Sequence, residues 1–374
     1  MKYALIIPDG VADEPQPDSG GQTPLEVAVT PAMDEIARMG VVGRADHVPS
    51  SLPSGSDVGM LSLLGYDPLV DHTGRAPIEA VAQSIELGED DWAIRCNLVT
   101  IAGGCMRSFT AGHIDNRAAA ELMDCLSQDL GDDSPWEYYP GVSYRNLLVY
   151  RPQGRGTEVT FSSRTVTSPP HDLLDLRIED HLPSGPGSVS LVPMMDRSRE
   201  LLAAVDHDSQ ATGVWLWGLG QCPQLEWFAE RYGKSAAVVT AVDLVRGLGR
   251  LLGMRVIEVD GATGYLDTDY TAKGQAAIAA LSEHDLVVVH VEATDEASHD
   301  GDMAGKVEAI ERIDECIVAP IHEYLAQAGD YRILVSPDHP TLLRTRTHAH
   351  GPVPIAACGT GLEGDVHESY NEAA

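Results

Sequence analysis

Short apolar runs recur along the chain and are separated by polar segments that favour turns and loops. They lie at residues 3–7, 213–217, 236–240, 255–259, 286–291 and 331–336. Short runs that are mostly apolar are typical of strands that are buried on both faces of a sheet. The pattern therefore predicts an α/β fold with a buried sheet.

Helical spacing is found between several of these runs. The clearest stripe has apolar residues three or four positions apart, at Val307, Ile310, Ile313, Ile317, Ile321 and Leu325. This spacing predicts an amphipathic helix, and Pro320 within it predicts a kink. Strands that alternate with helices indicate a mostly parallel sheet.

The segment from residue 88 to residue 205 has a different character. Its turns are polar and rich in glycine and proline, and it contains a strand pattern at residues 145–150. We interpret residues 88–205 as a smaller α+β domain, inserted as a lid into a core that is made of residues 1–87 and 206–374.

Charge limits the kinds of partner that the chain can have. Its 374 residues are enough for a large core, and its formal net charge is -32. Nucleic acids and anionic membranes attract proteins with excess lysine and arginine, so this charge argues against both as partners. If the ligand is itself an anion, bound metal ions and a few arginines must provide positive charge locally.

The apolar runs and the cysteines indicate the cellular compartment of the protein. The first apolar run meets Asp9 too early for a signal peptide, and no later run approaches the length of a bilayer span. The six cysteines are scattered without CxxC spacing, which indicates reduced thiols. We therefore expect a cytoplasmic protein.

Three of the predicted strands run directly into polar clusters. The run at residues 3–7 leads to Asp9, the run at 286–291 leads to Asp295 and His299, and the run at 331–336 leads to Asp338 and His339. Ligand sites of parallel α/β sheets lie beyond the carboxyl ends of the strands, so these clusters should converge. Aspartate and histidine together suit zinc or manganese. The sequence thus predicts a metal site.

Each cluster alone also has an ordinary explanation. An Asp-Gly pair after a strand is usually a turn, and a lone histidine is usually solvated. Asp295 and His299 could share one helical turn as an N-terminal acid with a chance histidine. A fourth cluster, with His348 and His350, follows within reach of Asp338. The combination of strand-end clusters favours metal binding over these separate explanations.

A glycine-bearing turn at residues 53–61 leads into a short apolar helical stretch that begins near Ser56. One interpretation makes Ser56 the N-cap of this helix. The other makes its hydroxyl a nucleophile, because a helix N-terminus favours an anion and a metal can deprotonate the hydroxyl. Ser54 and Ser62 are weaker candidates, because Ser54 lies further from the helix start and Ser62 lies inside the helix.

These segments together resemble cofactor-independent phosphoglycerate mutases of the archaeal type, a branch of the alkaline phosphatase superfamily. The resemblance extends over nearly the whole chain. It is carried by residues 8–10 (Pro-Asp-Gly), 55–57 (Gly-Ser-Asp), 64–68 (Leu-Gly-Tyr-Asp-Pro), 73–75 (Thr-Gly-Arg), 95–97 (Arg-Cys-Asn), 261–267 (Gly-Ala-Thr-Gly-Tyr-Leu-Asp), 293–299 (Ala-Thr-Asp-Glu-Ala-Ser-His) and 338–340 (Asp-His-Pro).

The resemblance implies a fold, a nucleophile and two metal ions. The fold would be a three-layer core like that of alkaline phosphatase with an inserted lid, and Ser56 would be the residue that is phosphorylated. The ions would be Mn²⁺ or Zn²⁺, with Mg²⁺ or Co²⁺ as further candidates. The ligands that it implies are Asp9, Ser56, Asp338 and His339 for one ion, and Asp295, His299 and His348 for the other. The family spacing to the terminal Pro-Val-Pro selects His348 over His350.

The implied activity is the interconversion of 3-phosphoglycerate and 2-phosphoglycerate through a phosphoserine. Arginine forks match phosphate and carboxylate groups, so the small phosphomonoester substrate should be bound by basic side chains. The candidates are Arg75, Arg95, His113, Arg145 and Arg246.

One segment departs from the archaeal pattern. Residues 108–113 read Ser-Phe-Thr-Ala-Gly-His where archaeal mutases have an Arg-Ala-Gly-Arg stretch. Here the chain resembles a bacterial subgroup that has been proposed to act as homoserine kinases. A homoserine kinase-like phosphotransferase and a phosphomonoesterase are therefore the alternative activities.

Overall fold

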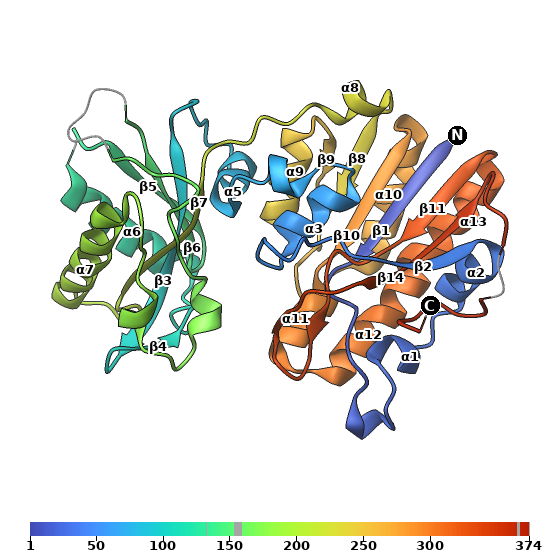
Figure 1. Cartoon of the computed structure of the whole chain (residues 1–374), viewed down its shortest axis with the longest axis horizontal. Helices are drawn as coiled ribbons and strands as arrows, with labels where there is room; N and C mark the ends of the chain where they lie inside the picture. Colours follow the sequence, from blue (N-terminus) through green and yellow to red (C-terminus); the bar gives the residue numbers. More distant parts are fainter. Residues whose placement is uncertain (132, 153–158, 365–366, 374) are drawn as a thin grey trace. The chain divides into compact units, whose positions relative to one another are not determined.

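The computed structural model describes residues 1–131, 133–152, 159–364 and 367–373 (Figure 1). The chain forms two compact units, each with its own hydrophobic core. Unit 1 consists of Met1–His72 and Gln224–Ala374, and unit 2 consists of Thr73–Pro223. The segment 88–205, which we predicted to be an insert, lies within unit 2.

Unit 1 is built on a seven-stranded sheet with the order β2-β14-β11-β1-β10-β8-β9. The strands β11, β1, β10, β8 and β9 are parallel, whereas β14 is antiparallel to both β11 and β2. The predicted α/β class with a mostly parallel sheet is thus confirmed. The bounds of these strands are β1 Lys2–Pro8, β2 Val41–Ala45, β8 Ala236–Val239, β9 Arg255–Ile257, β10 Leu286–Val291, β11 Tyr331–Val335 and β14 Val353–Gly359.

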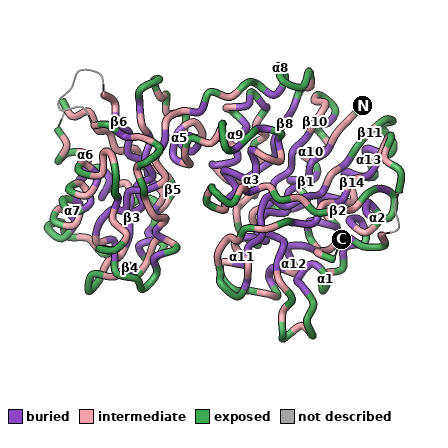
Figure 2. The backbone as a smooth tube through the Cα atoms, in the orientation of Figure 1, coloured by how far each residue is buried: buried purple, intermediate pink, exposed green. Residues whose placement is uncertain are grey.

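Helices cover both faces of this sheet. Ile6, Val289 and Ile333 share one apolar cluster with side chains from α2, α10, α12 and α13, whereas Gly249 of α9 lies against Val238 on the other face. Figure 2 shows the central strands as buried. The helices of unit 1 are α1 Pro24–Val27, α2 Pro31–Met39, α3 Ser56–Leu63, α4 Pro68–Asp71, α8 Phe228–Tyr232, α9 Asp243–Leu251, α10 Tyr270–Glu283, α11 Ala293–Asp300, α12 Met303–Ile313 and α13 Ala319–Ala328, with a short 3-10 turn at Pro17–Ser19. None of the helices within the described ranges is long and apolar enough to span a membrane.

The predicted stripe from residue 307 to residue 325 lies on one unbroken helical run that comprises α12, a π-helical segment and α13. A π-helical segment, Asp314–Val318, lies between α12 and α13. Pro320 occupies the first turn of α13, where its missing N–H is tolerated. The wider π turn before it keeps Ile317 and Ile321 in the same core.

Unit 2 contains an antiparallel sheet with the order β4-β3-β6-β5, in which β7 also pairs with β3. The apolar run at residues 213–217 lies in β7, so it belongs to this antiparallel sheet and not to the parallel one. Periodicity identified a strand here but could not identify its partner. The elements are β3 Trp92–Ala102, β4 Cys105–Ser108, β5 Trp136–Val142, β6 Arg145–Tyr150, β7 Gly213–Gly220, α5 Arg75–Ala82, α6 Asn116–Leu130 and α7 Ser188–Ala204, with 3-10 turns at Pro170–Leu173 and Ile178–His181.

Candidate functional site

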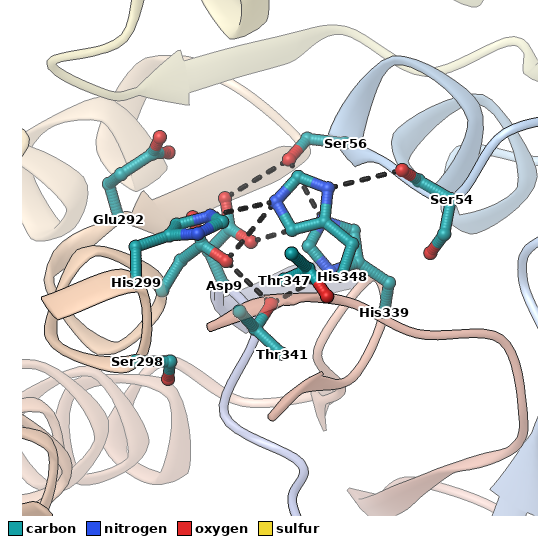
Figure 3. A network of polar contacts seen from close by, with 12 residues as sticks. Asp9, Ser54, Ser56, Glu292, Ser298, His299, His339, Thr341, Thr347 and His348 are labelled. Atoms are coloured by element: carbon teal, nitrogen blue, oxygen red, sulfur yellow. Dashed lines mark hydrogen bonds and ion pairs between the residues drawn. The ribbon is translucent and has the colours of Figure 1, made fainter. Parts of the chain in front are cut away.

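The polar clusters that follow β1, β10 and β11 meet at one edge of the unit 1 sheet. These strands are neighbours in the sheet and run parallel, so their carboxyl ends lie together. Asp9, Asp295 and Asp338 follow the three strands, and all three are buried. Figure 3 shows Ser56, His339 and His348 converging on Asp9 from other parts of the chain.

Asp9, Asp338 and His339 form the first group that could hold a cation, with ligand atoms all within 4.8 Å of one another. His339 Nε2 lies 3.5 Å from Asp9 Oδ1 and 3.5 Å from Asp338 Oδ2. These two carboxylate oxygens are buried, and neither has a hydrogen-bond partner among the described residues. Unpaired buried oxygens are costly without a compensating charge, so this donor set fits a divalent ion.

Electrostatics in this group point the same way. Burial raises the pKa of Asp9 well above its usual range, and the neighbouring Asp338 and Glu292 carboxylates raise this pKa further. Several buried carboxylates so close together repel one another unless a proton or a cation lies between them. A bound cation would provide that charge.

Asp295, His299 and His348 form the second group, also with ligand atoms within 4.8 Å of one another. Asp295 and His299 lie one turn apart on α11, and His299 Nε2 is 3.1 Å from Asp295 Oδ2. His348 lies on β13 (Thr347–His348), which pairs with β12 (Thr341–Leu342), and its Nε2 is 3.5 Å from Asp295 Oδ1. His350 is exposed.

Charge pairing sets the protonation of the second group. Burial alone would lower the pKa of His299, but the Asp295 carboxylate raises this pKa to about 9. Burial alone would raise the pKa of Asp295, but His299 and His348 lower this pKa well below its usual range. A metal ion would have to displace the proton of His299, because imidazole binds metals in its neutral form.

Ser56 lies at the first group. Gly55 is the N-cap of α3 and Ser56 is its first residue, so the N-cap interpretation of Ser56 is wrong. Its hydroxyl donates to Asp9 Oδ2 at 3.2 Å and lies 3.2 Å from His339 Nε2. The competing hydroxyls are bonded elsewhere, that of Ser54 to the carbonyl of Ala349 and that of Ser62 to the carbonyl of His47.

The sequence reasoning missed several side chains that support these groups. Thr341 Oγ1 donates to Asp295 Oδ1 at 2.6 Å and lies 3.3 Å from His339 Nδ1, so one hydroxyl contacts both groups. The backbone of Gly10 has φ +59°, and a Cβ there would lie 2.4 Å from Thr341 Oγ1. Glycine is therefore required next to Asp9.

His290 and Glu292 form a third group with Asp9, again with ligand atoms within 4.8 Å of one another. His290 is fully buried in β10, and its Nε2 lies 2.8 Å from Asp9 Oδ2. Neither residue was among the predicted ligands. The available signal was a histidine inside an otherwise apolar strand run, at residues 286–291.

In unit 2 the structure brings together two of the predicted substrate-binding arginines. Arg75 Nε donates to Glu79 Oε1 at 3.1 Å, and Arg95 Nε donates to Glu79 Oε2 at 2.8 Å. The Arg95 guanidinium also lies over the ring of Trp217, 4.2 Å from its centroid. Glu79 was not predicted, although its position four residues after Arg75 on a helix was a signal.

Arg145 completes a cluster of positive charge in unit 2. It lies opposite Asn97 in the β3–β6 pairing and stacks on Tyr144 at 4.5 Å. Burial lowers the pKa of Arg95 to about 10; Glu79 opposes this shift, and the charges of Arg75 and Arg145 add to it. An anion would relieve the repulsion among the three arginines.

The other two predicted substrate contacts belong to other elements. His113 is exposed in the loop between β4 and α6, with a backbone φ of +56°. Arg246 belongs to α9 of unit 1, and its guanidinium pairs with Glu258 at 2.9 Å.

The class that this structure defines is an α/β protein with candidate metal-binding groups around a serine at the carboxyl ends of parallel strands. A sequence model described as 2,3-bisphosphoglycerate-independent phosphoglycerate mutase matches residues 37–207. The protein of that name from Methanothrix thermoacetophila is 44% identical over 100% of this chain and 94% of its own length. A probable one from Geobacter sulfurreducens is 44% identical over 95% of this chain and 90% of its own length. The chain belongs to the 2,3-bisphosphoglycerate-independent phosphoglycerate mutase family.

Solved structures agree with this assignment. A Pyrococcus horikoshii protein has a TM-score of 0.77 and 27% identity, covering 100% of this chain and 91% of the other. The cofactor-independent phosphoglycerate mutase of Thermoplasma acidophilum has a TM-score of 0.61 and 26% identity, covering 100% of this chain and 94% of the other. The resemblance that was found from short motifs is thus confirmed over the whole chain.

Proposed function

We propose that this protein interconverts 3-phosphoglycerate and 2-phosphoglycerate without bisphosphoglycerate, through a phosphoserine at Ser56. The observation that carries the proposal is the place of the Ser56 hydroxyl, 3.2 Å from both Asp9 Oδ2 and His339 Nε2 within a buried donor set. Family membership supports the choice of substrate.

Two divalent ions, Mn²⁺ or Zn²⁺ or a similar ion, are part of the proposal. Asp9, Ser56, Asp338 and His339 would hold one, and Asp295, His299 and His348 would hold the other. Bound there, the ions would lower the pKa of the Ser56 hydroxyl and offset negative charge on the phosphoryl oxygens. The unpaired oxygens of Asp9 and Asp338 support this assignment.

Ser56 would carry the phosphoryl group between the two hydroxyls of glycerate. In the first step Ser56 Oγ loses its proton and bonds to phosphorus, and the bond from phosphorus to the substrate oxygen breaks. The released glycerate oxygen takes up a proton. In the second step the other hydroxyl of glycerate loses its proton and bonds to phosphorus, the bond from phosphorus to Ser56 Oγ breaks, and Ser56 Oγ takes up a proton.

The arginines of unit 2 would hold the substrate during this exchange. Glycerate must stay bound while it turns its second hydroxyl to the phosphoserine, because water would otherwise hydrolyse the intermediate. We propose that Arg75, Arg95 and Arg145 bind its carboxylate or phosphate, with His113 and Arg246 as further contacts, and that unit 2 acts as the lid. The shared charge of the three clustered arginines supports this role.

A parallel assay separates this function from its alternatives. One tube contains 3-phosphoglycerate and Mn²⁺ without ATP, and the other contains homoserine, ATP and Mn²⁺. We expect 2-phosphoglycerate in the first tube and no product in the second. Phosphohomoserine alone would mean that the chemistry is right and the substrate wrong, and free phosphate in both tubes would mean a phosphomonoesterase.

The cellular setting follows from the proposed reaction. Interconversion of these two phosphoglycerates is a step shared by glycolysis and gluconeogenesis, and we place it in the cytoplasm. The substrate is a small molecule, and the net charge of -32 supports no role for nucleic acid or an anionic membrane.

A further inference from the structure

We propose that His290 is a positioning residue that fixes the Asp9 carboxylate by a hydrogen bond and is not itself a metal ligand. The inference rests on the proposed function only in taking Asp9 as a metal ligand. It bears on the third group, Asp9, His290 and Glu292, whose spacing alone would also suit a cation. The hydrogen bonds around the His290 ring distinguish the two roles.

The contact between His290 and Asp9 requires a proton on the ring. His290 Nε2 lies 2.8 Å from Asp9 Oδ2, and both side chains are fully buried. Asp9 must be ionised to bind a metal, and an ionised carboxylate can only accept hydrogen bonds, so in that form Nε2 must carry the hydrogen. A nitrogen that donates a hydrogen has no lone pair for a metal. His299 and His348 differ from His290, because their Nδ1 atoms face the backbone carbonyls of Arg346 and Ser54. A carbonyl can only accept, so in those two rings Nδ1 keeps the hydrogen and Nε2 is the atom that can lose its proton to a metal.

The other side of the His290 ring fits the same tautomer. Thr240 Oγ1 lies 3.2 Å from His290 Nδ1 and accepts a hydrogen bond from the backbone N–H of Val242 at 3.1 Å. With that N–H on one of its lone pairs, the Thr240 hydroxyl can direct its own hydrogen to Nδ1. If the ring instead carried both protons, Nε2 would still donate to Asp9. The assignment of Nε2 as a donor therefore holds for either charge state.

The two oxygens of the Asp9 carboxylate have different surroundings and therefore different roles. Oδ2 accepts hydrogen bonds from His290 and from Ser56, whereas Oδ1 is buried without a hydrogen-bond partner in the described part of the chain. Oδ1 is thus the oxygen available to a cation, and His290 fixes the direction in which it points. Groups that orient a metal ligand typically contribute about 10–100-fold to metal affinity or activity.

Glu292 does not change this conclusion. Its Oε2 lies 3.7 Å from His290 Nε2, too far for a hydrogen bond. The Glu292 carboxylate instead lies against the Asp9 carboxylate and raises the pKa of Asp9. Its negative charge faces the same N–H and so favours the protonated Nε2. A third cation would need that proton to leave the ring.

Substitution of His290 tests the proposal with Mn²⁺ as the probe. His290→Gln keeps an amide N–H that can reach the position of Nε2, whereas His290→Leu removes the donor. We expect two Mn²⁺ ions per chain in the wild type, measured by metal analysis after dialysis. We expect the Kd of the ion that Asp9 binds to rise about 10–100-fold in His290→Leu. In His290→Gln this Kd should return most of the way to the wild-type value. His322→Leu, which removes a different buried histidine, should leave both Kd values unchanged.

Three bound ions in the wild type, with one lost in both His290 variants, would overturn the proposal in favour of a third metal site. If the variants do not fold, ¹⁵N NMR of the wild-type histidines decides instead. A proton on Nε2 of His290 that persists when diamagnetic Zn²⁺ is added supports positioning, and loss of that proton on Zn²⁺ binding contradicts it. These measurements need no turnover, so failure of the mutase assay would leave their outcome intact.

Discussion

The two units use opposite charges and opposite kinds of sheet to build their polar clusters. In unit 1 most of the carboxylates and histidines follow parallel strands, either directly, as Asp9 and Asp338 do, or on the helix α11 that follows β10, and the fold brings them together at one edge. In unit 2 arginines lie on a helix and on antiparallel strands, where one carboxylate, Glu79, joins Arg75 and Arg95. The first arrangement attracts cations and the second attracts anions. A phosphorylated substrate of the proposed kind requires both.

Loss of the nucleophile should have the largest effect. We expect Ser56→Ala to lower kcat/KM for 3-phosphoglycerate by at least about 10⁴-fold, because no other group can carry the phosphoryl between the two hydroxyls. The fold and most metal binding should persist, since only one ligand oxygen is lost. Mass spectrometry of the trapped wild type should find phosphate on Ser56.

Ser54→Ala is the matched control, because its hydroxyl is bonded to the carbonyl of Ala349. We expect activity within about twofold of the wild type, as for a substitution that changes stability by no more than a few tenths of a kcal/mol. Phosphate found on Ser54, Ser62 or a histidine would refute the assignment of Ser56.

The second group of unit 1 gives the next largest effect. His348→Ala should lower activity by more than about 100-fold, the upper end for residues that merely support a ligand, and should remove one of two bound ions. His350→Ala should stay within about twofold, because that side chain is exposed. Metal analysis and activity of both variants provide the check, and an equal loss in the two would mean that His348 is not a ligand.

The same contrast explains what the sequence could predict. Asp9, Asp338 and His339 follow apolar runs directly, so the rule that ligands collect at strand ends was enough to group them. The sequence could not reveal that β7 pairs with β3, because an apolar run contains no information about its partner. His290 was not predicted for a related reason. It lies within a strand, and only the pairing of β10 with β1 in the folded sheet places it against Asp9.

Unit 2 was harder to predict because its cluster depends on packing rather than on strand ends. The candidates were chosen because basic side chains match phosphate and carboxylate groups, and they were Arg75, Arg95, His113, Arg145 and Arg246. The sequence could not show which of these five side chains lie close to one another in the folded chain. Glu79 links two of the candidates, because its carboxylate pairs with both Arg75 and Arg95, which are 20 positions apart in the chain. Such a contact depends on how α5 packs against β3.

Weakening the arginine cluster should change substrate binding without changing metal content. Arg75→Met is expected to raise the KM for 3-phosphoglycerate about 10–100-fold, which corresponds to the loss of a charge-assisted hydrogen bond of about 1.5–3 kcal/mol. Arg107→Met is the control, because Arg107 pairs with Asp175 at the surface of the same unit. Steady-state kinetics should show the KM change only in Arg75→Met. Loss of bound Mn²⁺ in that variant would contradict the assignment of metal binding to unit 1 and of substrate binding to the arginines of unit 2.

The smallest predicted step is in the dependence of metal affinity on pH, at about tenfold for each pH unit. In the metal-free protein the pKa of His299 is raised from 6.5 to about 9 by Asp295, so at pH 7 the ring carries a proton. A metal ion must displace it, and Mn²⁺ affinity should therefore rise about tenfold per pH unit from pH 7 and level off above about pH 9.

The stability of the metal-free protein should change in the opposite direction. A raised folded-state pKa contributes stability that is fully present below 6.5 and is lost as the pH rises through about 9. Calorimetry in buffers of different ionisation enthalpy should detect proton release at pH 7 that disappears in His299→Ala, and a pH-independent affinity would show that His299 does not bind the ion.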